Sequence, residues 1–169
     1  MIAHLSSADF RVMPWANGKG ITVEMLRIER AGRLVLRLSR AMVVEDGPFS
    51  IFPGIERNLT VLSGPGFRLL KQGLSLEARL LEPVGFPGDV PVRAVDVGGP
   101  SEDFNVMTGR EFPPPRVWVK PAGEAPAGAI FALAPGKIGG LAVALYDLVI
   151  ADQPLPHDMM VIVVEAEGL

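Results

Sequence analysis

The sequence predicts an all-β fold. Its 169 residues contain 19 glycines and 16 prolines, which interrupt the chain at intervals of about ten residues and leave little room for long helices. The segments between these interruptions are short apolar runs, several of which alternate between apolar and polar side chains with the period of two that is typical of strands.

The first two predicted strands cover residues 21–30 and 34–39. In the first, Thr22 and Glu24 lie on one face and Met25 and Arg27 on the other. The second places its leucines on one face and Arg37 and Ser39 on the opposite face. A turn at Asn17-Gly18 precedes both strands.

Shorter strands follow, separated by turns rich in glycine and proline. We expect them at residues 59–62, 67–70, 76–81, 92–97 and 103–107. If the last of these is extended, Asp103, Asn105 and Met107 point the same way.

Three consecutive prolines, 113–115, mark the expected domain boundary, because proline cannot continue a strand ladder. We therefore predict one domain at 1–112 and a second at 113–169. Strands are expected in the second domain at 117–120, 129–133, 141–150 and 160–165. Periodicity alone does not separate strand from helix over 141–150, and the neighbouring loops favour a strand.

Composition limits the classes of function. With 16 Lys and Arg against 19 Asp and Glu, the net charge of −3 argues against nucleic acid or an anionic membrane as a partner. The absence of cysteine excludes disulfides, thiolate metal sites and cysteine nucleophiles. Residues 1–10 lack the pattern of a signal sequence, and the longest apolar run, 138–150, contains Asp147 and is too short to span a bilayer. We therefore expect a cytoplasmic protein.

Three blocks of residues carry the most local information. They are Met13-Pro14-Trp15 with Asn17-Gly18 and Gly20, Asp46-Gly47-Pro48-Phe49-Ser50 with Phe52-Pro53-Gly54 and Arg57, and Gly99-Pro100 with Asp103-Phe104-Asn105-Val106-Met107. In order and spacing they resemble the HutD/Ves family over roughly residues 10 to 110. The resemblance implies a cupin-type double-stranded β-helix in a compact two-barrel (bicupin) arrangement. It also implies a connection with histidine utilisation and no settled enzymatic role.

The cupin resemblance can be compared with the metal-binding pattern of cupin enzymes. With Gly64 as anchor, the positions of the two His and the Glu of that pattern are taken here by Ser50, Phe52 and Arg57. Arginine is a fixed cation that repels a metal ion, and the two histidines, His4 and His157, lie near opposite ends of the chain. The sequence therefore predicts neither a metal site nor a cofactor.

An arginine at the position of a metal-binding glutamate favours an anion site. Arg57 could bind a carboxylate with both arms of its guanidinium, while Ser50 and Asn105 orient it. The remaining candidate ligand-binding residues line the predicted barrel wall or the apolar side of a pocket. They are Asp103, Arg37, Ser39, Glu24, Trp15 and Phe49.

A structural role competes with the ligand-binding role for the arginines. A buried arginine needs a partner, and Arg57 with Asp103 or Arg37 with Glu24 could form internal ion pairs. Both readings remain open for Arg57, whereas for Arg37 the internal pair is favoured.

We therefore predict a metal-free cupin that binds a small carboxylate, such as urocanate or a formylated glutamate, as a sensing or accessory protein. One alternative is a metal-independent hydrolase or isomerase acting on such an acid, with Glu24 or Asp103 as acid or base, although no reaction follows from the residues. Another is an interaction protein without a ligand. Cupins associate through strand edges, so a homodimer is compatible with this fold.

Overall fold

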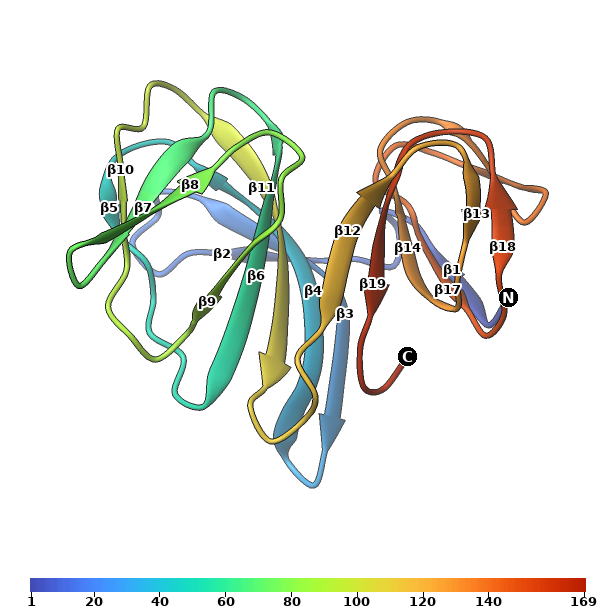
Figure 1. The fold of residues 1–169 in the computed structure, drawn as a ribbon, viewed down its shortest axis with the longest axis horizontal. Coiled ribbons are helices and arrows are strands. Elements are labelled where there is room, and N and C mark those ends of the chain that lie inside the picture. Colours follow the sequence, from blue (N-terminus) through green and yellow to red (C-terminus); the bar gives the residue numbers. More distant parts are fainter. The chain divides into compact units, whose positions relative to one another are not determined.

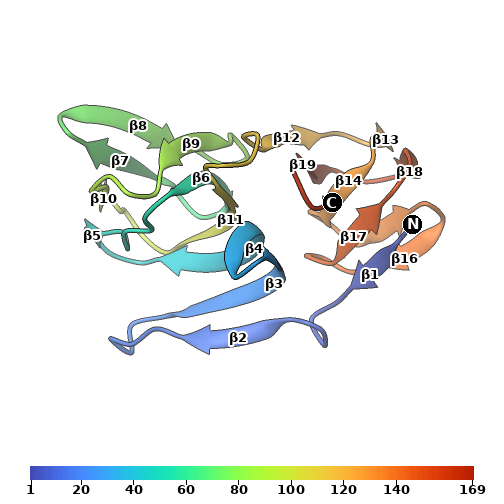
Figure 2. The same cartoon turned by 90° about the horizontal axis from the view of Figure 1, so that it is seen from below.

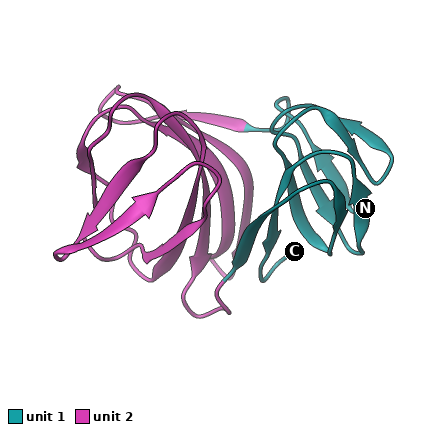
Figure 3. Ribbon diagram, turned by 45° about the horizontal axis from the view of Figure 1, so that its top comes forward, with its two compact units in different colours: residues 1–10, 115–169 teal, residues 11–114 magenta.

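The computed structural model describes all residues, 1–169, and consists of strands and turns (Figure 1). Its backbone divides into two compact units (Figure 3). Arg11–Pro114 contains the three sequence motifs and is called the motif unit; Met1–Phe10 together with Pro115–Leu169 form the second unit. None of the elements is a helix with the length and apolarity needed to cross a membrane.

The motif unit contains two antiparallel sheets (Figures 1 and 2). The first has six strands, in spatial order β2 (Arg11–Pro14), β3 (Ile21–Arg30), β4 (Arg33–Val43), β11 (Ser101–Gly109), β6 (Ile55–Ser63) and β9 (Val84–Pro87). The second has four strands, in spatial order β5 (Gly47–Pro48), β10 (Arg93–Val95), β7 (Phe67–Lys71) and β8 (Leu74–Ala78).

An apolar core joins these two sheets. Leu59 and Val61 of the six-stranded sheet are buried against Phe67, Leu69 and Ala94 of the four-stranded sheet. Alternation along β6 turns Arg57 to the same side as Leu59 and Val61, so this arginine points into the interior between the sheets. The core thus continues into a polar region at the Arg57 end of β6.

The second unit also contains two sheets. One has the order β1 (Ala3–Leu5), β17 (Leu148–Ala151), β14 (Gly128–Ala132), β19 (Val161–Glu165) and β12 (Arg116–Lys120). The other has the order β13 (Gly123–Ala125), β18 (Leu155–His157), β15 (Gly136–Ile138) and β16 (Leu141–Val143). An aliphatic core that includes Ile130, Ile138 and Val163 fills the space between them. The all-β, cupin-type fold is confirmed, whereas two complete barrels stay a prediction.

The first ten residues differ from the predicted domain division. They were expected with 11–112, yet β1 pairs with β17 through Ala3↔Ile150 and Leu5↔Leu148. Main-chain pairing with an edge strand satisfies backbone groups that the short β1 could not satisfy alone. The boundary in the proline run lies between Pro114 and Pro115.

Two predicted strands are interrupted. The run 141–150 forms β16 and β17 around a turn in which Tyr146 has φ 70° and Asp147 accepts a hydrogen bond from the Ala144 amide. In β3 a register shift between Glu24 and Leu26 breaks the predicted alternation. As a result Arg27, which was expected on the face opposite Glu24, comes within 3.8 Å of its carboxylate.

Gly64 is required where β6 ends. Its φ is +89°, and an added Cβ would lie 2.2 Å from the carbonyl oxygen of Pro100 and 2.7 Å from the Cα of Ser101. The next glycine of the turn, Gly66, donates its amide hydrogen to the buried Ser101 Oγ. The Gly64-Pro65-Gly66 turn is therefore packed directly against the start of β11.

We predict that Gly64→Ala lowers the free energy of unfolding by about 3 kcal/mol, because the methyl group meets backbone in addition to the strained φ. Gly73→Ala is the matched control: its φ is +77°, but the space around it is open, so a loss of about 1 kcal/mol is expected. Equilibrium denaturation in urea measures both. Equal losses for the two variants would contradict the packing role of Gly64.

Candidate functional site

The pairing of β11 with two neighbours brings the polar side chains of the site together. Asn105 lies opposite Ser39 of β4, and Met107 lies between Arg37 of β4 and Arg57 of β6. Directly opposed residues in antiparallel strands project from the same face of the sheet. Three strands therefore direct these side chains into the interior of the motif unit.

A cavity of about 430 Å³ occupies this interior, a volume within the usual range for small-molecule sites. Exposed residues such as Asn17 and Ser50 are part of its wall, so it reaches the surface. The lining residues are Trp15, Ala16, Asn17, Thr22, Arg37, Ser39, Ala41, Met42, Val43, Pro48, Phe49, Ser50, Phe52, Arg57, Asp103, Asn105 and Met107.

Eight of the nine residues that the sequence singled out as candidates line this cavity. Asp103, Asn105 and Met107 all do so, in agreement with the alternation expected for 103–107. Glu24 is the exception and lies behind the wall as the partner of Arg37.

Arg57 is a buried cation whose contacts within the protein are weak. Its side chain is enclosed, with 9% relative exposure. One Nη donates to the Ser50 carbonyl oxygen and the other to Asn105 Oδ1, both at the long distance of 3.5 Å, and Nε has no partner. The internal ion pair with Asp103 is not formed within 4.0 Å. The guanidinium therefore retains unused hydrogen-bonding capacity.

Three phenylalanine rings surround the Arg57 guanidinium. Its Cζ lies 5.2, 5.3 and 5.1 Å from the ring centres of Phe49, Phe52 and Phe86. The rings attract the cation but offer it no hydrogen bonds. Burial lowers the pKa of Arg57 to about 10, with Asp103 acting in the opposite direction, so the side chain still carries its positive charge at neutral pH.

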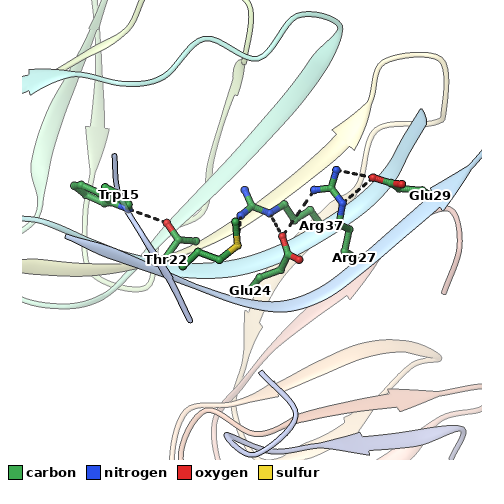
Figure 4. Close-up of polar contacts among 7 residues, drawn as sticks. Trp15, Thr22, Glu24, Arg27, Glu29 and Arg37 are labelled. Carbon is green, nitrogen blue, oxygen red and sulfur yellow. Dashed lines mark hydrogen bonds and ion pairs between the residues drawn. The ribbon is translucent and has the colours of Figure 1, made fainter. Parts of the chain in front are cut away.

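Arg37 differs from Arg57 because it has a carboxylate partner. Its Nε donates to Glu24 Oε2 at 2.6 Å, and both side chains are nearly buried (Figure 4). Arg27 approaches the same carboxylate from outside and also binds Glu29 (Figure 4). The internal pair favoured by the sequence is thus observed, and Glu24 as a ligand-binding residue is a prediction that the structure does not support.

Asp103 and Asn105 form a buried polar pair next to Arg57. The Asn105 amide group donates to Asp103 Oδ1 and accepts from Arg57, so it connects the two charged groups. Burial raises the pKa of Asp103 to about 7, although Asn105 and Arg57 both favour the ionised form. A carboxyl group whose pKa is raised towards neutral pH thus lines the cavity.

Trp15 closes one side of the cavity in a fixed orientation. Its indole N–H donates to Thr22 Oγ1 at 2.9 Å, as Figure 4 shows, and its ring packs on Gly20, where an added Cβ would lie 2.9 Å from it. The site also includes Phe86, which sequence reasoning missed. Phe86 lies opposite Arg57 in the pairing of β9 with β6, and only this long-range register reveals its role.

The three positions that correspond to cupin metal ligands meet in space, but their chemistry does not suit a metal. The Arg57 guanidinium lies between the Ser50 carbonyl and the Phe52 ring. A permanent cation and an aromatic ring offer no ligand pair for a metal ion. No group of three or more His, Asp or Glu side chains in the structure has a geometry that could hold one.

Comparison with known proteins gives a consistent family match. The HutD family model matches residues 7–129. The chain is 39% identical over 106 residues to an uncharacterized 21.2 kDa protein in the hutC 3′ region of Pseudomonas putida, covering 61% of this chain and 56% of that protein. It is 37% identical over 111 residues to Protein Ves of Citrobacter koseri, covering 61% and 57%. The chain therefore spans little more than half the length of these curated relatives.

A solved structure extends the similarity over nearly the whole chain. HutD from Pseudomonas fluorescens SBW25, described for a formate condition, superposes with a TM-score of 0.81 at 27% sequence identity. The match covers 98% of this chain and 99% of that one. Both units of the present chain thus have counterparts in that structure.

We predict that Asp103→Asn changes the pH dependence of stability. Because the pKa of Asp103 rises from 3.8 to about 7 on folding, the native state holds a proton that the unfolded chain has lost, and stability falls as the pH rises from about 4 through 7. The asparagine variant does not lose stability in this way. The difference between its unfolding free energy and that of the wild type should therefore shift in favour of the variant between about pH 4 and pH 7, by an amount on the order of 4 kcal/mol.

Urea denaturation of both proteins between about pH 4 and pH 8 measures this difference. Glu102→Gln is the control, because it removes the neighbouring carboxylate, whose side chain is partly exposed and paired with Arg40. A constant difference between Asp103→Asn and wild type across the window would contradict a raised pKa for Asp103.

Proposed function

The chain belongs to the HutD family, as its sequence motifs indicate, and on that basis we propose that its motif unit binds a small carboxylate as a sensing or accessory protein of histidine utilisation. The observation that carries this proposal is Arg57, a buried cation in a cavity without an ion-pair partner. Candidate ligands are urocanate and a formylated glutamate.

The energetics of Arg57 favour an anionic ligand. A buried charge without a compensating partner is costly, and removing it from water is offset only by a close opposite charge with good hydrogen bonds. Within the protein Arg57 has two donor contacts at 3.5 Å and three aromatic rings. A ligand carboxylate would supply both the charge and the two short, parallel hydrogen bonds that a guanidinium can donate.

The surroundings suit a ligand with a carboxylate at one end and a planar or apolar body. Ser50 and Asn105 offer polar groups beside Arg57, while Trp15 and Phe49 contribute aromatic surface. Arg37 is already neutralised by Glu24, so it adds less attraction for an anion than Arg57 does. Arg57 can therefore compensate the charge of one ligand carboxylate in the site.

The relatives support the proposed connection with histidine utilisation. One is described by its location in the hutC 3′ region, and a solved structure with a matching fold is named HutD. Formate, which appears in the description of that structure, is the smallest carboxylate and a useful minimal probe. A cytoplasmic location is part of the same proposal.

A second candidate function is a metal-independent hydrolase or isomerase acting on such an acid. Asp103 favours it, because a cavity-lining carboxyl group with a pKa of about 7 can exchange protons at neutral pH. Turnover of a bound acid that is lost in Asp103→Asn would distinguish this enzyme from a sensing or accessory protein.

We predict that Arg57→Ala weakens binding of urocanate, N-formyl-L-glutamate or formate by at least about a hundredfold, because the charged hydrogen bonds to the carboxylate are lost. Isothermal titration calorimetry of each acid measures this effect. Since Arg57 has no internal carboxylate partner, the variant should remain folded.

Arg110→Ala is the matched control. It makes the same change in net charge in the same unit, but Arg110 is bound to Asp89 and Glu56 outside the cavity. This variant should bind like the wild type. Binding that Arg57→Ala leaves unchanged, or no binding of any of the three acids to the wild type, would overturn the proposal.

A further inference from the structure

The cavity contains an acid as well as a cation. Asp103 is 2% exposed, lies on the cavity wall, and is joined to Arg57 through the side-chain amide of Asn105. Asn105 donates to Oδ1 of Asp103, and no donor of the protein reaches Oδ2. A ligand bound at Arg57 would therefore lie close to a buried carboxyl group with one unused oxygen.

The charges around Asp103 come from four neighbouring strands. Arg57 on β6 favours the ionised carboxylate, while Glu102, the preceding residue on β11, disfavours it and is itself paired with Arg40 of β4. Arg37 on β4 is neutralised by Glu24 on β3. Arg57 is thus the one nearby cation without a carboxylate partner of its own.

When a carboxylate binds to Arg57, the guanidinium no longer stabilises the ionised form of Asp103. The ligand neutralises Arg57 and places a second negative charge beside Asp103 in a region of low dielectric constant. Two buried carboxylates that share a site cannot both stay ionised at little cost, so one of them takes up a proton. The ligand carboxylate is held by Arg57, which leaves Asp103 as the group that is protonated.

We propose that this site binds a carboxylate together with one proton, which Asp103 holds on Oδ2 and donates to an acceptor atom of the ligand. This inference rests on the proposed function and specifies its ligand class. The ligand is an acid with a net negative charge and a hydrogen-bond acceptor, such as a carbonyl, hydroxyl or second carboxylate oxygen, near its bound carboxylate.

Binding of the ligand is accompanied by the transfer of one proton. One proton leaves the solvent, one O–H bond forms on Asp103, and no covalent bond of the ligand changes. With Asp103 neutral, Arg57 and the ligand carboxylate compensate one another, and Arg37 remains compensated by Glu24. A ligand with an ammonium group near Asp103 would instead keep this carboxyl group ionised, so it would bind without taking up a proton.

The sign of the pH dependence follows from this coupling. The free site holds its proton below the pKa of about 7, and the bound site holds it to a higher pH. Affinity is therefore greatest below about pH 7 and falls above it by up to tenfold per pH unit, until the pKa of the bound state is passed.

The test is isothermal titration of the intact chain with urocanate, N-formyl-L-glutamate and formate between about pH 7 and pH 9, where their carboxylates stay ionised. Each titration is repeated in phosphate and in Tris, whose heats of ionisation differ, so the number of protons taken up is measured directly. We expect the wild type to take up as much as one proton per bound urocanate or N-formyl-L-glutamate and to lose affinity for both as the pH rises. Formate, which has no acceptor besides its carboxylate, should show a smaller uptake.

Asp103→Asn keeps the size of the side chain and a donor group but cannot titrate, so its affinity should be independent of pH and its proton uptake zero. Glu102→Gln, the matched control, should retain proton uptake and the loss of affinity with rising pH, although the loss begins at a lower pH because Glu102 helps to raise the pKa of Asp103. Arg57-dependent binding with no proton uptake, or with proton release, would overturn this inference and leave the proposed function standing. If none of the acids binds in a manner that depends on Arg57, both fail.

Discussion

The pairing of β11 with β4 on one side and β6 on the other is the constraint on which the site depends. This register places Asn105 beside Ser39 and brings Arg37 and Arg57 to either side of Met107. The Gly64 turn fixes the end of β6 against the start of β11, because Gly64 contacts the backbone at Pro100 and Ser101. A slip of β11 by one residue would turn Asp103, Asn105 and Met107 to the other face of the sheet.

Arg37 and Arg57 lie on the same face of the sheet but differ in their partners. Arg37 is bound by Glu24 at 2.6 Å as part of the cavity wall, whereas Arg57 is enclosed by aromatic rings and has only long hydrogen bonds. The nearby Asp103 does not form an ion pair with Arg57, because the side-chain amide of Asn105 lies between the two groups and is hydrogen-bonded to both. The result is a cavity that contains one cation without a carboxylate partner and one buried acid whose pKa is raised towards neutral pH.

Local patterns in the sequence were sufficient for the β class and for the strands around Arg37 and Asp103, and together with the family resemblance they identified eight residues of the cavity wall. They failed where pairing between distant segments decides which unit a strand joins or which side chains meet. The ten N-terminal residues join the second unit through β17, and Phe86 reaches Arg57 only through the pairing of β9 with β6. The bulge in β3 likewise moved Arg27 to the side of Glu24, because an inserted residue reverses the alternation that a sequence pattern assumes.

The Arg57 guanidinium has no internal carboxylate within ion-pair distance, and under the proposed function it binds the carboxylate of a ligand instead. A crystal structure of the protein grown with N-formyl-L-glutamate tests this most directly. We expect a ligand carboxylate at hydrogen-bond distance from both Nη atoms of Arg57, with Asn105 beside it and Asp103 turned towards another ligand oxygen. An empty cavity in which Arg57 instead forms a short ion pair with Asp103 would contradict it.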